Sequence, residues 1–259
     1  MVKLKNYNGV LTLFVIFLTF FLVVSCSKQH YQVSKIEGKR ITITDKEFQE
    51  PAIENYIKPY RENINKELDS VLAYCPVTLD KSTGKWQTPI GNLMADVTLQ
   101  RGNVVFKARE KKTIDICILN HGGIRSILPK GNVTARTAYE IMPFENSLVV
   151  IALKGEQIFE LVDYFITTKK PHPLSGISFT ISKDNIAKNI VVQGKPVEKE
   201  TTYYVATNDY LSNGGDNMNF FKKGTQKFDL DYKLRNILID YFKEVDTIPV
   251  INDVRISVE

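Results

Sequence analysis

Apolar positions along the chain alternate between helical and strand patterns. Apolar side chains recur at steps of three and four between residues 51 and 74, which predicts an amphipathic helix with proline in its first turn. The same spacing predicts helices at residues 91–100, 158–165 and 234–241. Runs of apolar and β-branched residues predict strands at residues 39–44, 114–119, 147–153, 177–181, 190–192, 203–207 and 254–258.

The order of these elements indicates the fold class. Helices and strands are intermixed, and the spacing between residues 177 and 207 is typical of β-hairpins. The runs at residues 114–119 and 147–153 are almost continuously apolar, which is typical of strands buried on both faces. We therefore predict an α/β (α+β) domain over residues 46–259, with mixed β-sheets layered with helices and a long N-terminal helix.

The first residues have the pattern of an export signal. Two lysines precede an apolar run over residues 10–24, whose last two valines begin the sequence Val-Val-Ser-Cys that ends at Cys26. A small residue directly before a cysteine is a lipobox pattern. We expect residues 1–26 to be a lipoprotein signal peptide with Cys26 lipidated, and residues 27–45 to be a tether with a short strand. The protein would then be exported and lipid-anchored in the bacterial cell envelope. The alternative is an uncleaved signal anchor.

Composition and charge narrow the possible ligands. Hydrophobic residues make up 43% of the chain, and the formal net charge is +5. The lysines are scattered rather than gathered in a stripe, so nucleic acid is not an expected partner. Cys75 and Cys117 remain besides Cys26, and neither has metal-ligand spacing. Because Cys117 lies in an apolar run, we expect a buried thiol there rather than a disulfide with Cys75.

Three polar segments at the ends of predicted elements are candidates for ligand binding. The strand at residues 203–207 leads into a turn with two glycines that contains Tyr210 and Asp216. An aromatic face beside a carboxylate suits a nucleoside, through stacking on the base and hydrogen bonds to the ribose. The same turn is also an ordinary way to end a strand.

The other two candidate segments are short loops. Asn-His-Gly-Gly-Ile-Arg, which ends at Arg125, follows a buried strand and combines close backbone approach with a planar cation. A simple turn with a surface ion pair is the alternative. Pro-Phe-Glu-Asn places Phe144 and Asn146 between a helical stretch and a strand. Phe144 is either a core side chain or the tip of a loop.

The order of the motifs resembles one known domain. Gly-Asn-Leu-Met-Ala-Asp at residues 91–96, the segments at 120–125 and 143–146, Leu-Lys-Gly at 153–155 and the turn at 208–216 together look like the C-terminal domain of the 5′-nucleotidases. The similarity covers approximately residues 50–245. It implies a domain that binds the nucleoside part of a nucleotide, and therefore a place in nucleotide catabolism.

The resemblance implies a role for seven residues. Phe144 and Tyr210 would stack on the two faces of the base, with Tyr210 in a place usually held by phenylalanine, and Asp216 would accept hydrogen bonds from the ribose hydroxyls. The residues implied in polar contacts or in lining the pocket are Asn120, Arg125, Asn146 and Gly176.

The chain also departs from the family pattern. His121 stands where the first glycine of a triplet is usual, which would make the loop less open. Trp86 and Gln87 occupy the places of an Arg-Glu pair, so a cation on the ligand side is lost or is replaced imperfectly by Lys85.

The resemblance places hydrolysis in a different domain. In the family, an N-terminal metallophosphatase domain holds two metals that clamp the attacking and leaving oxygens. His30, His121 and His172 of this chain show no such ligand pattern. We expect no catalytic residues, no metal and no cofactor in this chain.

Three hypotheses for the function follow. In the first, the chain is the substrate-binding half of a hydrolase, and a separate metallophosphatase with divalent metals docks near the helix at residues 51–74. In the second, it is a non-catalytic nucleoside- or nucleotide-binding surface lipoprotein. In the third, it is a degenerate scaffold without a pocket.

Overall fold

The computed structural model describes residues 7–24, 32–44, 47 and 50–259. The chain divides into two compact units, Met1–Pro51 and Ala52–Glu259. In the first unit, helix α1 (Tyr7–Val24) is strongly apolar, and Cys26 with the residues around it lies outside the described part. No helix within the described residues is both long and apolar enough to span a membrane. Residues 32–44 form no strand, so the predicted strand at 39–44 is wrong: a short apolar alternation is not stable without a pairing strand.

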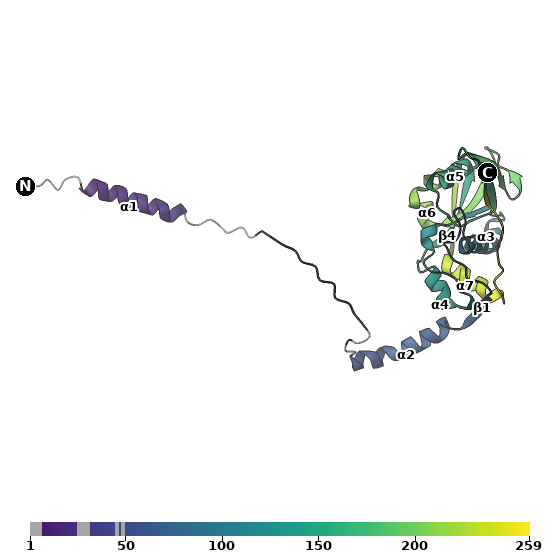
Figure 1. Cartoon of the computed structure of the whole chain (residues 1–259), viewed down its shortest axis with the longest axis horizontal. Coiled ribbons are helices and arrows are strands. Elements are labelled where there is room, and N and C mark those ends of the chain that lie inside the picture. Colours follow the sequence, from purple (N-terminus) through teal and green to yellow (C-terminus); the bar gives the residue numbers. More distant parts are fainter. Residues whose placement is uncertain (1–6, 25–31, 45–46, 48–49) are drawn as a thin grey trace, which may run out of the picture. The chain divides into compact units, whose positions relative to one another are not determined.

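The second unit contains all the remaining helices and strands of the described chain (Figure 1). Its first half consists of α2 (Pro51–Leu68), β1 (Val71–Cys75), α3 (Pro89–Glu110), β2 (Ile116–Ile118), η1 (His121–Gly123), β3 (Gly131–Thr134), α4 (Ala135–Ile141) and β4 (Ser147–Lys154). Its second half consists of α5 (Gly155–Thr168), β5 (Leu174–Ser175), β6 (Ile177–Ile181), β7 (Ala187–Val192), β8 (Lys195–Pro196), β9 (Thr202–Asn208), α6 (Asp209–Ser212), η2 (Gly215–Asn217), η3 (Asn219–Lys223), β10 (Gln226–Lys233), α7 (Leu234–Glu244) and β11 (Ile256–Val258).

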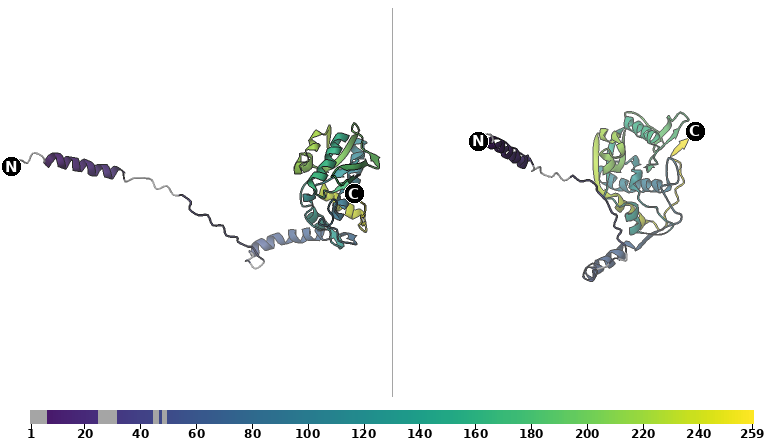
Figure 2. Two further views of the ribbon diagram at one scale, coloured as in Figure 1. Left: turned by 45° about the horizontal axis from the view of Figure 1, so that its top comes forward. Right: turned by 60° about the vertical axis from the view of Figure 1, so that its left-hand side comes forward.

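A five-stranded mixed sheet forms the centre of this unit (Figure 2). Its strand order is β10-β4-β9-β2-β5, in which β9 and β2 are parallel and the other neighbours are antiparallel. A second sheet, with the order β11-β6-β7-β8, and the pair β1-β3 complete the fold. The predicted α/β class with mixed sheets is confirmed, and the predicted last strand is present as β11 at the edge of the second sheet.

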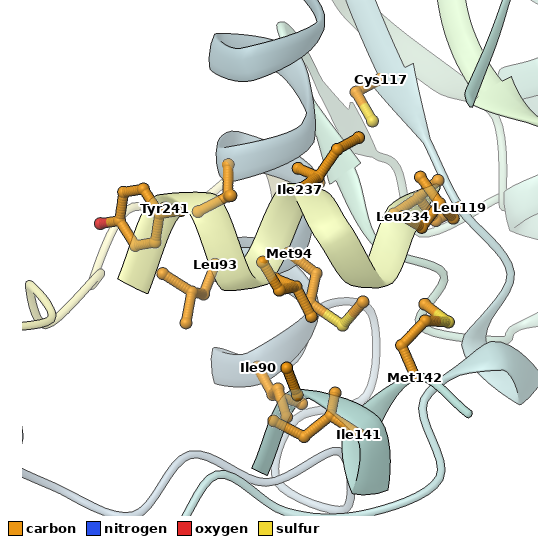
Figure 3. Close-up of a cluster of buried hydrophobic side chains, with 14 of the residues drawn as sticks. Ile90, Leu93, Met94, Cys117, Leu119, Ile141, Met142, Leu234, Ile237 and Tyr241 are labelled. Carbon is orange, nitrogen blue, oxygen red and sulfur yellow. The ribbon is translucent and has the colours of Figure 1, made fainter. Parts of the chain in front are cut away.

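The central sheet is buried on both faces because its side chains alternate between two hydrophobic clusters. Leu148 and Val150 of β4 belong to the cluster under α3, α4 and α7, whereas Val149 and Ile151 belong to the cluster under α5. Figure 3 shows the first cluster, in which α7 packs across α3 beside Cys117. The prediction of strands with both faces buried is confirmed.

The predicted helices differ in length from the observed ones, and α2 and α3 show the physical reasons. α2 ends at Leu68, and Val71 begins strand β1, which pairs with β3. The helical spacing continues into β1 by coincidence, since the pairing partner lies about sixty residues further along the chain. α3 is longer than predicted: it begins at Pro89, where the hydroxyl of Thr88 accepts a hydrogen bond from the Gly91 N–H, and continues to Glu110.

The cysteines of the second unit are free. Cys75 and Cys117 are both buried and unpaired, which confirms the prediction for Cys117. Burial raises the pKa of the Cys117 thiol, so the group stays protonated and behaves as a small apolar side chain.

Candidate functional site

Three loops meet at one edge of the central sheet. Because β9 is parallel to β2 and antiparallel to β4, the ends of β2 and β9 lie at the same edge as the start of β4. These loops surround a cavity of about 340 Å³, a volume in the range of small-molecule sites. The residues that line it are Asn120, Gly122, Phe144, Asn146, Tyr210 and Asp216.

The cavity has two aromatic side chains at its surface. Phe144 is 43% exposed and Tyr210 is 47% exposed, which excludes the alternative that Phe144 is a core residue. Gly215 supports Tyr210 from below: a Cβ atom at this position would lie 2.5 Å from Cε1 of the tyrosine ring. The Gly-Gly-Asp turn therefore needs its second glycine so that the backbone can pack against the ring.

The carboxylate of Asp216 is held by Tyr210. The tyrosine hydroxyl donates to Oδ1 of Asp216 at 3.0 Å and accepts from the Asp216 N–H at 3.2 Å. The backbone of Asp216 is left-handed, with φ 51°. A side-chain carboxylate held in this way remains an acceptor for further hydroxyl groups, because it has about four lone-pair positions.

Two asparagines supply amide groups to the cavity. Nδ2 of Asn146 donates to Asp209 at 2.7 Å, and Oδ1 of Asn120 accepts from Nδ2 of Asn208 at 2.7 Å. Each bond sets the orientation of its amide. Within the described residues, Oδ1 of Asn146 and Nδ2 of Asn120 have no hydrogen-bond partner. Besides the Asp216 carboxylate, the two asparagines therefore offer an amide oxygen as an acceptor and an amide nitrogen as a donor to a ligand.

Arg125 lies at the rim of the cavity rather than in its wall. Its guanidinium carbon is 5.7 Å from the centre of the Phe144 ring, and Nη1 donates weakly to the Gly122 carbonyl at 3.4 Å. The side chain is exposed. It can stabilise the stacking ring by a cation–π contact and can reach an anion outside the cavity.

Gly176 is not part of this site, and the prediction that it lines the pocket is wrong. It lies between β5 and β6 and borders a different cavity together with Asp96, Gln193 and Arg255. Its φ is +82°, and a Cβ atom would lie 2.0 Å from the Asp115 carbonyl oxygen. The glycine is required for this close approach of two backbone segments, which the sequence pattern does not distinguish from a ligand contact.

His121 and the segment at Trp86 also lie outside the cavity wall. The His121 ring is half-buried against the Pro171 carbonyl, and burial together with Lys81 and Lys170 lowers its pKa. Trp86 is buried in the core, and Lys85 rests 5.3 Å from the centre of its ring. Lys85 is not among the residues that line the cavity.

Gln87, which follows Trp86, also makes its contacts away from the cavity. The Gln87 side chain donates to the Asp253 carbonyl and accepts from the Arg255 N–H, which fastens the C-terminal segment to the domain.

Lys81, which sequence reasoning missed, donates to the Ile124 carbonyl and so brings a cation to the Asn120–Arg125 loop. No group of three or more metal-ligating side chains occurs in the part of the chain that the structure describes.

The fold and the cavity define an α/β ligand-binding domain with two aromatic walls and a polar rim. The chain belongs to the family described as 5′-nucleotidase, C-terminal domain, whose model matches residues 72–223. The resemblance noted in the sequence is thereby confirmed.

Several known proteins are similar to the chain. The trifunctional nucleotide phosphoesterase protein YfkN of Bacillus subtilis is 25% identical over 83% of this chain and 15% of its own length. A 5′-nucleotidase of Vibrio cholerae is 23% identical over 70% of this chain and 32% of its own length. The structure of a 5′-nucleotidase precursor from Thermus thermophilus superimposes with a TM-score of 0.65 and 26% identity, over 80% of this chain and 42% of that one. The chain thus spans less than half the length of these relatives.

Proposed function

We propose that the chain binds the nucleoside part of a nucleotide and is the substrate-binding half of a 5′-nucleotidase-type phosphohydrolase. The observation that carries the proposal is the cavity in which Phe144, Tyr210 and Asp216 meet. Two exposed aromatic rings beside a hydrogen-bonded carboxylate match a flat apolar base joined to a sugar with hydroxyl groups. Relatives that carry the name 5′-nucleotidase support a nucleotide as the ligand.

The proposal gives each cavity residue a role. Phe144 and Tyr210 stack on the two faces of the base, and Asp216 accepts from the ribose hydroxyls. Asn120 and Asn146 offer the donor and the acceptor that their internal hydrogen bonds leave available. Arg125 lies at the rim beside Phe144, and its charge would attract the phosphate group of a bound nucleotide.

A separate metallophosphatase chain supplies the divalent metals and the hydrolytic chemistry in this proposal. Helix α2 offers a surface for it. None of its residues is buried, and Ile53, Tyr56, Tyr60 and Ile64 are each more than half exposed. These side chains follow the three- and four-residue spacing and form one apolar stripe, which is typical of a helix that packs against a partner.

Phosphate release tests the split arrangement. The purified chain is mixed with a candidate metallophosphatase and divalent metal, and release of phosphate from AMP is followed. We expect the chain to increase the rate of hydrolysis over that of the phosphatase alone. No increase with any metallophosphatase encoded beside this chain would contradict the proposal of a split enzyme.

Substitutions on α2 locate the interface. Ile53→Glu with Ile64→Glu places two charges in the apolar stripe and is expected to abolish the increase in phosphate release. Asn55→Glu adds a charge to the opposite face of the same helix and serves as the matched control. Adenosine binding by all three proteins is expected to be equal, because α2 does not line the cavity. Equal stimulation by the stripe variant and the control would exclude α2 as the interface.

We further propose that the protein is exported and lipid-anchored in the cell envelope through Cys26. The apolar helix α1, which ends at Val24 two residues before Cys26, supports this. Labelled fatty acid supplied to growing cells should be incorporated into the wild-type protein and not into Cys26→Ser. Equal labelling of both proteins would contradict lipidation at Cys26.

A further inference from the structure

A series of partly buried hydrogen bonds lies behind Asp216. It consists of His172, which is only 1% exposed, and Tyr164 of helix α5. Neither side chain lines the cavity. These hydrogen bonds connect the turn that carries Asp216 to the loop that carries Asn120, two segments that are about ninety residues apart in the sequence.

The direction of each hydrogen bond follows from chemistry. The His121 N–H donates to Nδ1 of His172 at 3.2 Å, so Nδ1 carries no proton. A neutral imidazole then carries its proton on Nε2, which lies 3.4 Å from the Tyr164 hydroxyl oxygen and donates to it. The Tyr164 hydroxyl in turn donates its own proton to the Asp216 carbonyl at 2.8 Å. All three bonds run in one direction, from the Asn120 loop to Asp216.

Asp216 needs such support because of its backbone. It is a non-glycine residue in the left-handed region, a conformation that persists only where the surroundings determine it. Tyr210 holds its N–H and its carboxylate, and Tyr164 holds its carbonyl. The two tyrosines therefore fix both ends of the residue, and with them the direction of its side chain.

We propose that Tyr164 and His172 are positioning residues that aim the Asp216 carboxylate at the ribose and hold it in register with the Asn120 loop. The inference rests on the proposed nucleoside binding. It predicts a specific defect: loss of the Tyr164 hydroxyl weakens recognition of the ribose hydroxyls and leaves recognition of the base unchanged.

The test compares adenosine with 2′,3′-dideoxyadenosine, which lacks both ribose hydroxyls, by titration calorimetry. Tyr164→Phe removes the hydroxyl and keeps the ring that packs against Phe220 and His172. Tyr232→Phe is the matched control, since it removes a half-buried tyrosine hydroxyl that donates to Asp240 at 2.7 Å, away from the cavity.

We expect the wild type to bind adenosine at least about tenfold more tightly than the dideoxynucleoside, the range for hydrogen bonds to a charged group. Tyr164→Phe should reduce this ratio at least about threefold by weakening adenosine alone, and Tyr232→Phe should leave it unchanged. His172→Phe, which removes the other two bonds, should reduce it as well.

Two results would overturn the inference and leave the proposed function standing. One is a Tyr164→Phe variant that keeps the full wild-type preference for adenosine over the dideoxynucleoside. The other is an equal loss for both nucleosides, which would indicate a structural role only. A wild type that binds neither nucleoside would instead overturn the proposed function itself.

Discussion

His172 makes the stability of the domain sensitive to acid. Its pKa is lowered from 6.5 to about 4, chiefly by burial. The charges of His121 and Lys170 lower it further, and the nearby Asp216 acts against this shift. In the folded protein the ring is therefore neutral at pH 7, as its acceptor bond from the His121 N–H requires.

The sign of the effect follows from proton uptake by the two states. The unfolded chain protonates His172 as the pH falls below about 6.5, whereas the folded chain resists protonation down to about pH 4. The unfolded state binds more protons in this window, so the free energy of unfolding decreases as the pH falls through it. The full difference of the two pKa values corresponds to roughly 3 kcal/mol, of which about 2 kcal/mol is lost by pH 5.

Denaturant unfolding of the wild type and of His172→Gln at pH 8 and pH 5 measures this contribution. Glutamine keeps one acceptor and one donor but does not titrate. We expect the wild type to lose about 2 kcal/mol more than the variant between the two pH values. Because all other titrating groups are common to both proteins, equal losses would refute a buried neutral His172.

Three further substitutions test the cavity. Phe144→Ala removes one stacking face, and calorimetry should show adenosine affinity weakened about tenfold or more, since stacking of one base contributes roughly 1–3 kcal/mol; unchanged affinity would exclude Phe144 as a wall. Gly215→Ala places a methyl group against the Tyr210 ring and should also weaken adenosine in the same assay, and equal binding would show that the ring tolerates the shift. Arg235 holds the Phe144 loop by an ion pair with Glu145 and a hydrogen bond to the Pro143 carbonyl, and Glu145→Gly removes the ion pair. It should weaken adenosine at most about fivefold, and less at high salt, because the glutamate is exposed; a salt-independent loss would argue against the ion pair.

The local spacing of apolar residues predicts a helix or strand correctly where that spacing matches the faces that are buried in the fold. In β4, consecutive apolar residues fill both clusters, so the run itself predicts a strand with two buried faces. α5 and α7 were predicted for the same reason, because each has one apolar side. α2 was predicted too long, since the pairing of β1 with β3 depends on residues far away in the sequence.

In the candidate site, too, the sequence predicts residues that belong to a motif but not residues whose role depends on contacts with distant segments. Residues in recognisable motifs, such as Phe144 and Tyr210, meet in the cavity as predicted. Gly176 was assigned to it wrongly, because a glycine required by a neighbouring backbone has the same signature as one required by a ligand. Tyr164 and His172 were missed as supports of Asp216, since their contacts join α5 to loops that carry no motif including them.

Titration of the purified chain with adenosine tests the central claim most directly. We predict saturable binding of one adenosine per chain, weakened at least about tenfold in Asp216→Ala, which removes the acceptor for the ribose hydroxyls. Absence of binding by the wild type, or equal binding by wild type and Asp216→Ala, would contradict it.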